Sequence, residues 1–183
     1  MRLNGRLYEA IKARIERRRP CALHHTALKV HVPEGCFVLE TMWPSRMVTR
    51  RREALSSRAR FFGTLLGRRR TFRYEVRRWR NGVLPDADEA VGGPRTVSND
   101  ADQARRLLAV VAPVPALIWG RDQLVTGEMW NSNSVISWLL VRSGVSMEAI
   151  DLPEGGRAPG WDAGIAIANR SDHARQHEGS DHF

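Results

Sequence analysis

The sequence predicts an α+β fold in which an antiparallel sheet packs against helices. Two strand-like runs, 24–32 and 36–43, are separated by a short link that contains Pro33 and Gly35, which predicts a β-hairpin. A strongly apolar run follows the polar stretch NSNS at 131–134 and predicts a buried helix. Because the predicted strands and helices are grouped along the chain and do not alternate regularly, an antiparallel sheet is expected in place of a parallel one.

The first expected element is an amphipathic helix over residues 3–18, which Pro20 ends. Its apolar positions recur every four residues and are Leu3, Leu7, Ile11 and Ile15. This stripe is narrow, so the helix is expected at the edge of the domain or against a protein partner. Basic residues beside the stripe also suit a membrane surface, and the sequence leaves that alternative open.

An arginine-rich insert, residues 46–80, follows the hairpin. Its residues 47–67 have the spacing of an amphipathic helix. Residues 71–79 alternate aromatic and apolar side chains with arginines, which predicts a strand. Residues 81–100 are rich in glycine, proline and aspartate, and this composition predicts a loop.

The second half of the chain is expected to contain two helices. Ser98 or Asn99 is expected to cap a helix that runs through about Val111. The buried helix is expected over residues 131–143, with Gly144 where a C-terminal cap belongs.

The end of the chain is expected to form a loop at 152–161, a short final strand at 164–168 and a polar, disordered tail from residue 169. The predicted organisation is an N-terminal helix over 1–20, a domain over 21–170 that includes the insert, and a polar tail over 171–183.

The composition is that of one globular domain. A chain of 183 residues has room for a hydrophobic core. Its two cysteines, Cys21 and Cys36, are too few for a disulfide scaffold and are expected as buried free thiols. The sequence contains neither a CxxC nor an HExxH motif, so no metal and no cofactor are expected. It also contains no secretory signal and no apolar run that could span a membrane, which favours a cytoplasmic location, alone or within a larger assembly.

The net charge of +9 is unevenly distributed. Residues 46–80 hold thirteen arginines and two glutamates, a local excess of +11, while residues 1–20 contribute +5 and the remainder is −7. Three interpretations fit this insert: a solvated arginine face, a nucleic-acid-binding surface with aromatic residues among the arginines, or a surface for anionic lipid or an acidic protein. The candidate polyanion-binding residues are two triplets, Arg50, Arg51, Arg52 and Arg68, Arg69, Arg70.

Two interpretations also fit the stretch NSNS. In the first, Asn131, Ser132 and Ser134 only cap the helix and satisfy its first N–H groups. In the second, Ser132 is a nucleophile in the first turn, where backbone N–H groups around Asn131 and Asn133 and the helix dipole stabilise an oxyanion. A serine nucleophile needs a base within hydrogen-bond reach. The candidate bases lie on the first predicted strand and are His24, His25 and His31.

Four segments resemble an uncharacterised bacterial domain family with an N-S-N-[ST] signature, namely HTALKV, VLETMW, WNSNSVISWLL and LPEGGRAPGW. That family is similar to the circularly permuted papain-like superfamily, which includes NlpC-like amidases and lecithin:retinol acyltransferase-like enzymes. The resemblance covers roughly residues 24–43 and 119–165 and leaves the insert outside. It implies that the α+β domain is a permuted papain-like fold.

The resemblance also implies site residues. In the superfamily, a histidine on a strand precedes the nucleophile, and the nucleophile opens a helix after an asparagine. This match assigns His25 as the base, Ser132 as the nucleophile and Glu40 as the third polar residue, although Glu40 also suits a simple pair with an arginine. Serine replaces the usual cysteine, so attack by a thiolate is lost and the hydroxyl depends wholly on its histidine.

Two functions are therefore expected as alternatives. The first is a hydrolase or acyltransferase that acts on an amide, ester or thioester. The second is a catalytically inactive structural or interaction module that binds nucleic acid or an acidic partner through the insert.

Neutralising either arginine triplet separates the interpretations of the insert. If the arginines bind a polyanion, the variant binds more weakly and its affinity depends less steeply on salt. Its folding barely changes, because a solvated charge contributes within about 0.5 kcal/mol. If the arginines anchor the insert to the acidic remainder of the chain, the melting temperature falls and binding is unaffected. Unfolding curves and salt titrations with DNA, RNA and anionic vesicles distinguish these outcomes, and unchanged melting without any binding leaves a solvated face.

Overall fold

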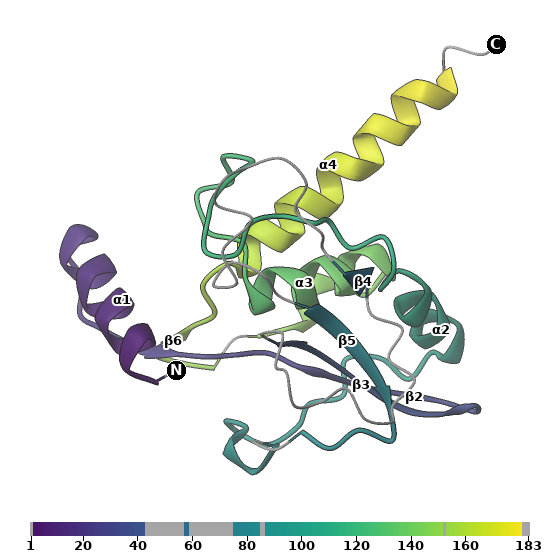
Figure 1. The fold of residues 1–183 in the computed structure, drawn as a ribbon, viewed down its shortest axis with the longest axis horizontal. Helices are drawn as coiled ribbons and strands as arrows, with labels where there is room; N and C mark the ends of the chain where they lie inside the picture. The colour runs from purple at the N-terminus through teal and green to yellow at the C-terminus, as the bar shows by residue number, and fades with distance from the viewer. Residues whose placement is uncertain (1, 43–56, 59–74, 85–86, 152, 181–183) are drawn as a thin grey trace.

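The computed structural model describes residues 2–42, 57–58, 75–84, 87–151 and 153–180. In this part of the chain, helices pack against an antiparallel sheet, which confirms the predicted α+β class (Figure 1). None of the helices described there has the length and apolarity that a bilayer crossing requires. Both arginine triplets of the insert lie outside the described residues.

The main sheet has the strand order β2, β3, β5, β4, and each neighbouring pair is antiparallel. Its strands are β2 Leu28–Val32, β3 Gly35–Met42, β4 Ser57–Arg58 and β5 Glu75–Arg80. β2 and β3 form the predicted hairpin, and β5 overlaps the strand predicted over residues 71–79. Val30, Leu39 and Val76 lie on one face of this sheet and are buried in the core.

Two parts of the sheet differ from the prediction. β2 begins at Leu28, and the backbone groups of His24 and Thr26 before it bond to the Asn133 side chain of the central helix region. Ser57 and Arg58 were expected in a helix but form β4, which pairs with β5. Backbone pairing along β5 outweighs the helical spacing at these two positions.

The central helix is α3, Ser132–Arg142, and its apolar side chains are almost all buried. It contacts β3, α2 (Ala101–Ala109) and α4 (Trp161–Ser180), and Figure 1 shows α3 and α4 on the same side of β2 and β3. A helix that is apolar on all sides is stable only when it is enclosed. This helix was predicted, and Gly144, with φ +81°, follows its C-cap as expected.

The predicted final strand at 164–168 is wrong, because these residues lie in α4. Gly164 and Ala168 are one helical turn apart and are buried, and a Cβ on Gly164 would overlap the carbonyl group of Ser134 in α3. A short apolar run is compatible with either a strand or a buried helix, and here the close packing against α3 favours the helix. The segment predicted as a disordered tail continues α4 to Ser180.

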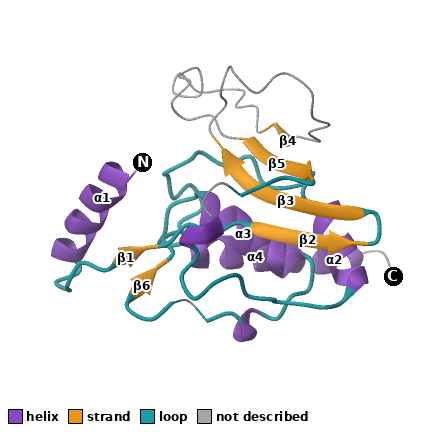
Figure 2. Ribbon diagram, turned by 90° about the horizontal axis from the view of Figure 1, so that it is seen from below, coloured by secondary structure: helices purple, strands orange, loops and turns teal. Residues whose placement is uncertain are grey.

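A second, two-stranded pair lies apart from the main sheet. β1, Ala22–Leu23, pairs in parallel with β6, Gly156–Arg157, which falls in the predicted loop at 152–161. Figure 2 shows this pair between α1, Arg2–Ile15, and the rest of the molecule. The pair fixes where the chain enters the segment that leads into β2.

Two further expectations are corrected in detail. Asp100 caps α2, in place of either residue before it, and accepts hydrogen bonds from the N–H groups of Asp102 and Gln103. Both cysteines, Cys21 and Cys36, are free thiols as predicted, but they are partly exposed where burial was expected.

A buried carboxylate joins α1 to the segment that follows it. Glu9 is 4% exposed and accepts hydrogen bonds from the Arg18 guanidinium and from the backbone N–H of Cys21 at 2.9 Å. The hydrogen bond from Arg18 is the main reason that the pKa of Glu9 is lowered to about 2. Ile11 and Ile15, at the end of the stripe, are 52% and 71% exposed.

Replacing Glu9 should therefore change how stability depends on pH. A carboxyl whose pKa is lowered on folding stabilises the fold above its ordinary pKa of 4.5, and this contribution is lost as the pH falls towards about 2. Glu9→Gln should remove the fall in stability between pH 4.5 and about 2. It should also lower the melting temperature at pH 7 by several degrees, since hydrogen bonds to a charged group contribute about 1.5–3 kcal/mol. Thermal unfolding between pH 7 and pH 2 measures both effects. The exposed Glu154→Gln is the control, and identical profiles for the two variants would contradict the anchoring role.

Candidate active site

The amino-terminal end of α3 is closed by a reciprocal cap. Oδ1 of Asn131 accepts hydrogen bonds from the backbone N–H groups of Asn133 at 2.8 Å and Ser134 at 3.3 Å. In return, Oγ of Ser134 accepts a hydrogen bond from the backbone N–H of Asn131 at 3.0 Å and donates to the carbonyl of Met129. The predicted N-cap, Asn131, is confirmed, and the cap is complete without Ser132.

The Ser132 hydroxyl instead faces a histidine. Its Oγ lies 2.8 Å from Nδ1 of His25, and this is its only hydrogen bond within the described part of the chain. Ser132 is 7% exposed, whereas His25 is exposed. When the imidazole is neutral with its proton on Nε2, Nδ1 is the acceptor and the hydroxyl is the donor. That is the polarity that a base needs to take the serine proton.

The Asn133 side chain holds the backbone on both sides of His25. Its Oδ1 accepts hydrogen bonds from the backbone N–H of Thr26 at 3.0 Å and from Oγ1 of Thr26 at 2.9 Å. Its Nδ2 donates to the carbonyl oxygens of His24 and Pro159, each at 3.0 Å. One side chain next to Ser132 therefore connects the first turn of α3 to the segment that carries His25.

One backbone N–H of this turn has no partner among the described residues, and it belongs to Ser132 itself. The cap occupies the N–H groups of Asn133 and Ser134 and leaves the N–H of Ser132, one residue earlier, without a bond to the Asn131 side chain. The N–H lies next to the hydroxyl in the chain and at the positive end of the helix dipole. It can therefore donate to negative charge that develops on the oxygen of a carbonyl group whose carbon bonds to Oγ.

A glycine permits this crowded geometry. Gly160 has φ +85°, and a Cβ at this position would lie 2.5 Å from Oγ of Ser134, 2.6 Å from the Met129 carbonyl and 2.7 Å from Oδ1 of Asn131. Its N–H donates to Oε2 of Glu128 at 2.7 Å. Position 160 thus needs a residue that both adopts a left-handed backbone and lacks a side chain.

The other two candidate bases lie elsewhere. The ring of His24 packs over Gly156, where a Cβ would overlap it, and its backbone N–H donates to the carbonyl of Arg157. His31 is an exposed residue of β2, with Nε2 3.8 Å from Sγ of Cys36. Of the three candidates, the structure brings only His25 within hydrogen-bond distance of Ser132 in the described residues.

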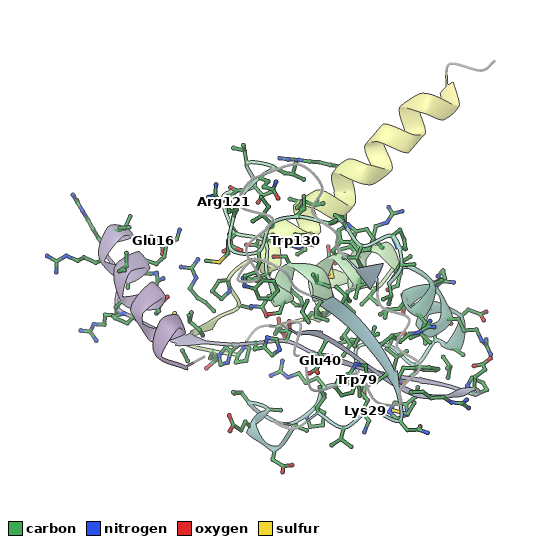
Figure 3. All side chains as sticks on the ribbon, viewed as in Figure 1. Glu16, Lys29, Glu40, Trp79, Arg121 and Trp130 are labelled. Atoms are coloured by element: carbon green, nitrogen blue, oxygen red, sulfur yellow. The ribbon has the colours of Figure 1, made fainter. Side chains whose placement is uncertain are left out.

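Glu40, the third predicted residue, lies on β3 directly opposite Arg77 in the strand register. It alternates with Leu39, whose side chain is in the core, so Glu40 belongs to the other face of the sheet. Figure 3 shows Glu40 with Lys29 and Trp79 on the side of the sheet away from α3. Its role as the group that orients His25 remains a prediction from the resemblance.

Sequence reasoning missed the bonding role of Asn133 and the need for glycine at position 160. Thr26 is 107 residues from Asn133 in the sequence, so no local pattern could have paired them. The dipeptide Pro159-Gly160 is typical of a turn. The sequence pattern does not indicate that this turn contacts the helix cap.

Within the described residues, no three histidine, cysteine or acidic side chains are grouped as metal ligands would be. Comparisons of the chain with family models, with curated proteins and with solved structures found no match. The arguments for function therefore depend on the geometry of the site itself.

Adding a side chain at Gly160 should open the cap. Gly160→Ala places a methyl group against three oxygen atoms at 2.5–2.7 Å, in addition to the cost of a left-handed alanine. Gly155→Ala is a matched control, because Gly155 has φ +69° and no atom within 4 Å of its added Cβ. We expect the control to lose about 1–2 kcal/mol of unfolding free energy, and Gly160→Ala to lose at least that much again through the broken cap. Denaturant unfolding measures both, and equal losses would contradict the close approach.

Proposed function

We propose that this chain is a papain-like hydrolase or acyltransferase that acts on an amide, ester or thioester, with Ser132 as the nucleophile and His25 as the base. One observation carries the proposal: the Ser132 hydroxyl is left out of a complete helix cap and lies 2.8 Å from Nδ1 of His25. A serine needed only for capping would bond to the backbone of its own helix. A serine–base contact at this distance is the arrangement that nucleophilic catalysis requires.

The steps follow from these atoms. Oγ of Ser132 attacks the substrate carbonyl carbon, and the serine proton passes to Nδ1 of His25. The carbonyl oxygen becomes an oxyanion, which the backbone N–H of Ser132 stabilises. When the bond to the leaving group breaks, His25 returns the proton to that group and an acyl ester remains on Ser132. Water, or an acceptor amine, alcohol or thiol, then attacks the ester with His25 again as the base, and Ser132 is regenerated.

The order of the elements supports the papain-like part of the proposal. His25 precedes the nucleophile in the sequence, and the nucleophile opens the buried helix directly after an asparagine, as the resemblance implies. The resemblance also implies that the histidine lies on a strand, whereas His25 lies between β1 and β2. Glu40 keeps its proposed place as the third polar residue on the strand that pairs with β2. Its position on the other sheet face gives this part of the proposal the weakest support.

A second candidate function is an interaction module without catalysis. The observation in its favour is the local charge excess of +11 in residues 46–80, together with the exposed Ile11 and Ile15 on α1. In this role the insert binds nucleic acid or another acidic surface, and α1 binds a protein partner in a larger assembly.

A fluorophosphonate probe tests the catalytic proposal. We expect the probe to label Ser132, as mapped by peptide mass spectrometry, and Ser132→Ala to abolish the label. His25→Ala should lower the labelling rate about 10²–10⁴-fold, because a general base contributes that much. His31→Ala removes an exposed strand histidine away from Ser132 and should leave the rate unchanged. Labelling that survives Ser132→Ala, or no labelling of the wild type by fluorophosphonate, would count against a catalytic serine.

A further inference from the structure

We propose that Asn133 is the positioning residue for His25, an inference that rests on the proposed function of Ser132. Its side-chain amide holds the backbone on both sides of His25 and so places Nδ1 at the nucleophile. The argument depends on four hydrogen bonds of this amide and on its place next to Ser132 in the chain.

The segment that carries His25 lies between two strands and belongs to neither. β1 ends at Leu23 and β2 begins at Leu28, and between them the His24 N–H still donates to the carbonyl of Arg157 in β6. Asn133 bonds to the two backbone groups next to residue 25. It accepts from the N–H of Thr26 and donates to the carbonyl of His24, which are the groups on either side of residue 25. These two bonds fix the backbone of His25 and therefore the direction of its Cα–Cβ bond.

The amide has one orientation only. Both bonds of its oxygen come from donors on Thr26, and both bonds of its nitrogen go to carbonyl oxygens, of His24 and Pro159. Turning the amide over would set its NH₂ group against a backbone N–H and its oxygen against two carbonyls. At 4% exposure, Asn133 has little water to replace these partners.

The same residue is tied to the nucleophile. Asn133 follows Ser132 in the first turn of α3, and its backbone N–H is held by the Asn131 cap. The side chain of Asn133 therefore holds the segment of the base, and its backbone is covalently joined to the nucleophile. This matters because His25 itself is exposed, and an exposed side chain on a freely moving backbone would seldom meet Ser132.

The variants separate positioning from general stability. Asn133→Ala removes all four hydrogen bonds, and Asn133→Asp keeps the acceptor for Thr26 but sets a carboxylate against the His24 and Pro159 carbonyls. The matched control is Gln103→Ala, because Gln103 also donates from its side chain to a backbone carbonyl, that of Gly144, beyond the other end of α3. Circular dichroism and melting temperature establish that each variant folds.

The first readout is the rate of fluorophosphonate labelling as a function of pH. In the wild type the rate should fall as the pH is lowered and the imidazole that acts as the base is protonated. Asn133→Ala and Asn133→Asp should label about 10²-fold more slowly, the loss expected when a reacting group is displaced by about 1 Å, and should lose this His-dependent fall. Gln103→Ala should keep the rate and the shape of the profile. A rate for Asn133→Ala within about threefold of the wild type, with the same profile, would overturn the inference.

The second readout does not depend on catalysis. Long-range ¹H–¹⁵N spectra, assigned with His25→Ala, report which imidazole nitrogen carries the proton. The wild type should show the Nε2–H form of His25, and Asn133→Ala should show averaged tautomers. Unchanged His25 nitrogen shifts in Asn133→Ala overturn the positioning role, whatever the labelling result. If the wild type never labels but these shifts change, the catalytic proposal fails and the positioning of His25 by Asn133 is supported.

Discussion

Water has little access to the amino-terminal turn of α3, and the N–H groups of Asn133 and Ser134 are satisfied there by a side chain and not by water. That side chain belongs to Asn131, and its position leaves no space for a Cβ at Gly160. The carbonyl of Pro159 accepts from both Asn131 and Asn133, which ties the start of α4 to the start of α3. The path of the chain into α4, and into β2 on the other side, thus follows from the way one buried helix end is satisfied.

Capping and nucleophilic attack, which compete as interpretations of the sequence, belong to different residues in the structure. Asn131 and Ser134 complete the cap, which leaves the hydroxyl and the N–H of Ser132 for other partners. A cysteine in this position would be favoured as a thiolate by the helix dipole, even before a base acts on it. A serine gains little in that way because its hydroxyl stays protonated. The contact with His25 is therefore the feature on which the proposed chemistry depends most.

Local patterns predicted the elements that local interactions define. The hairpin, the buried helix and its Asn131 cap each follow from residues that are neighbours in the sequence. The run 164–168 was misassigned because its apolar residues carry no period of their own, and only the packing of Gly164 against α3 makes it helical. The hydrogen bonds of Asn133 to the segment 24–26 were beyond prediction for a related reason, since they join parts of the chain that only the tertiary fold brings together.

The contacts around the site contribute different amounts of free energy, and the stronger ones determine the geometry of the site. Arg157 joins Glu16, in the turn directly after α1, to Glu128, whose other oxygen accepts from the N–H of Gly160. Ion pairs of such partly exposed groups contribute about 0–1 kcal/mol each. Asn133 is buried and Asn131 is partly buried, and a buried polar group left without its partner costs about 1–3 kcal/mol. The two asparagines on either side of Ser132, and not the charged residues that reach α1, therefore determine where His25 and Ser132 meet.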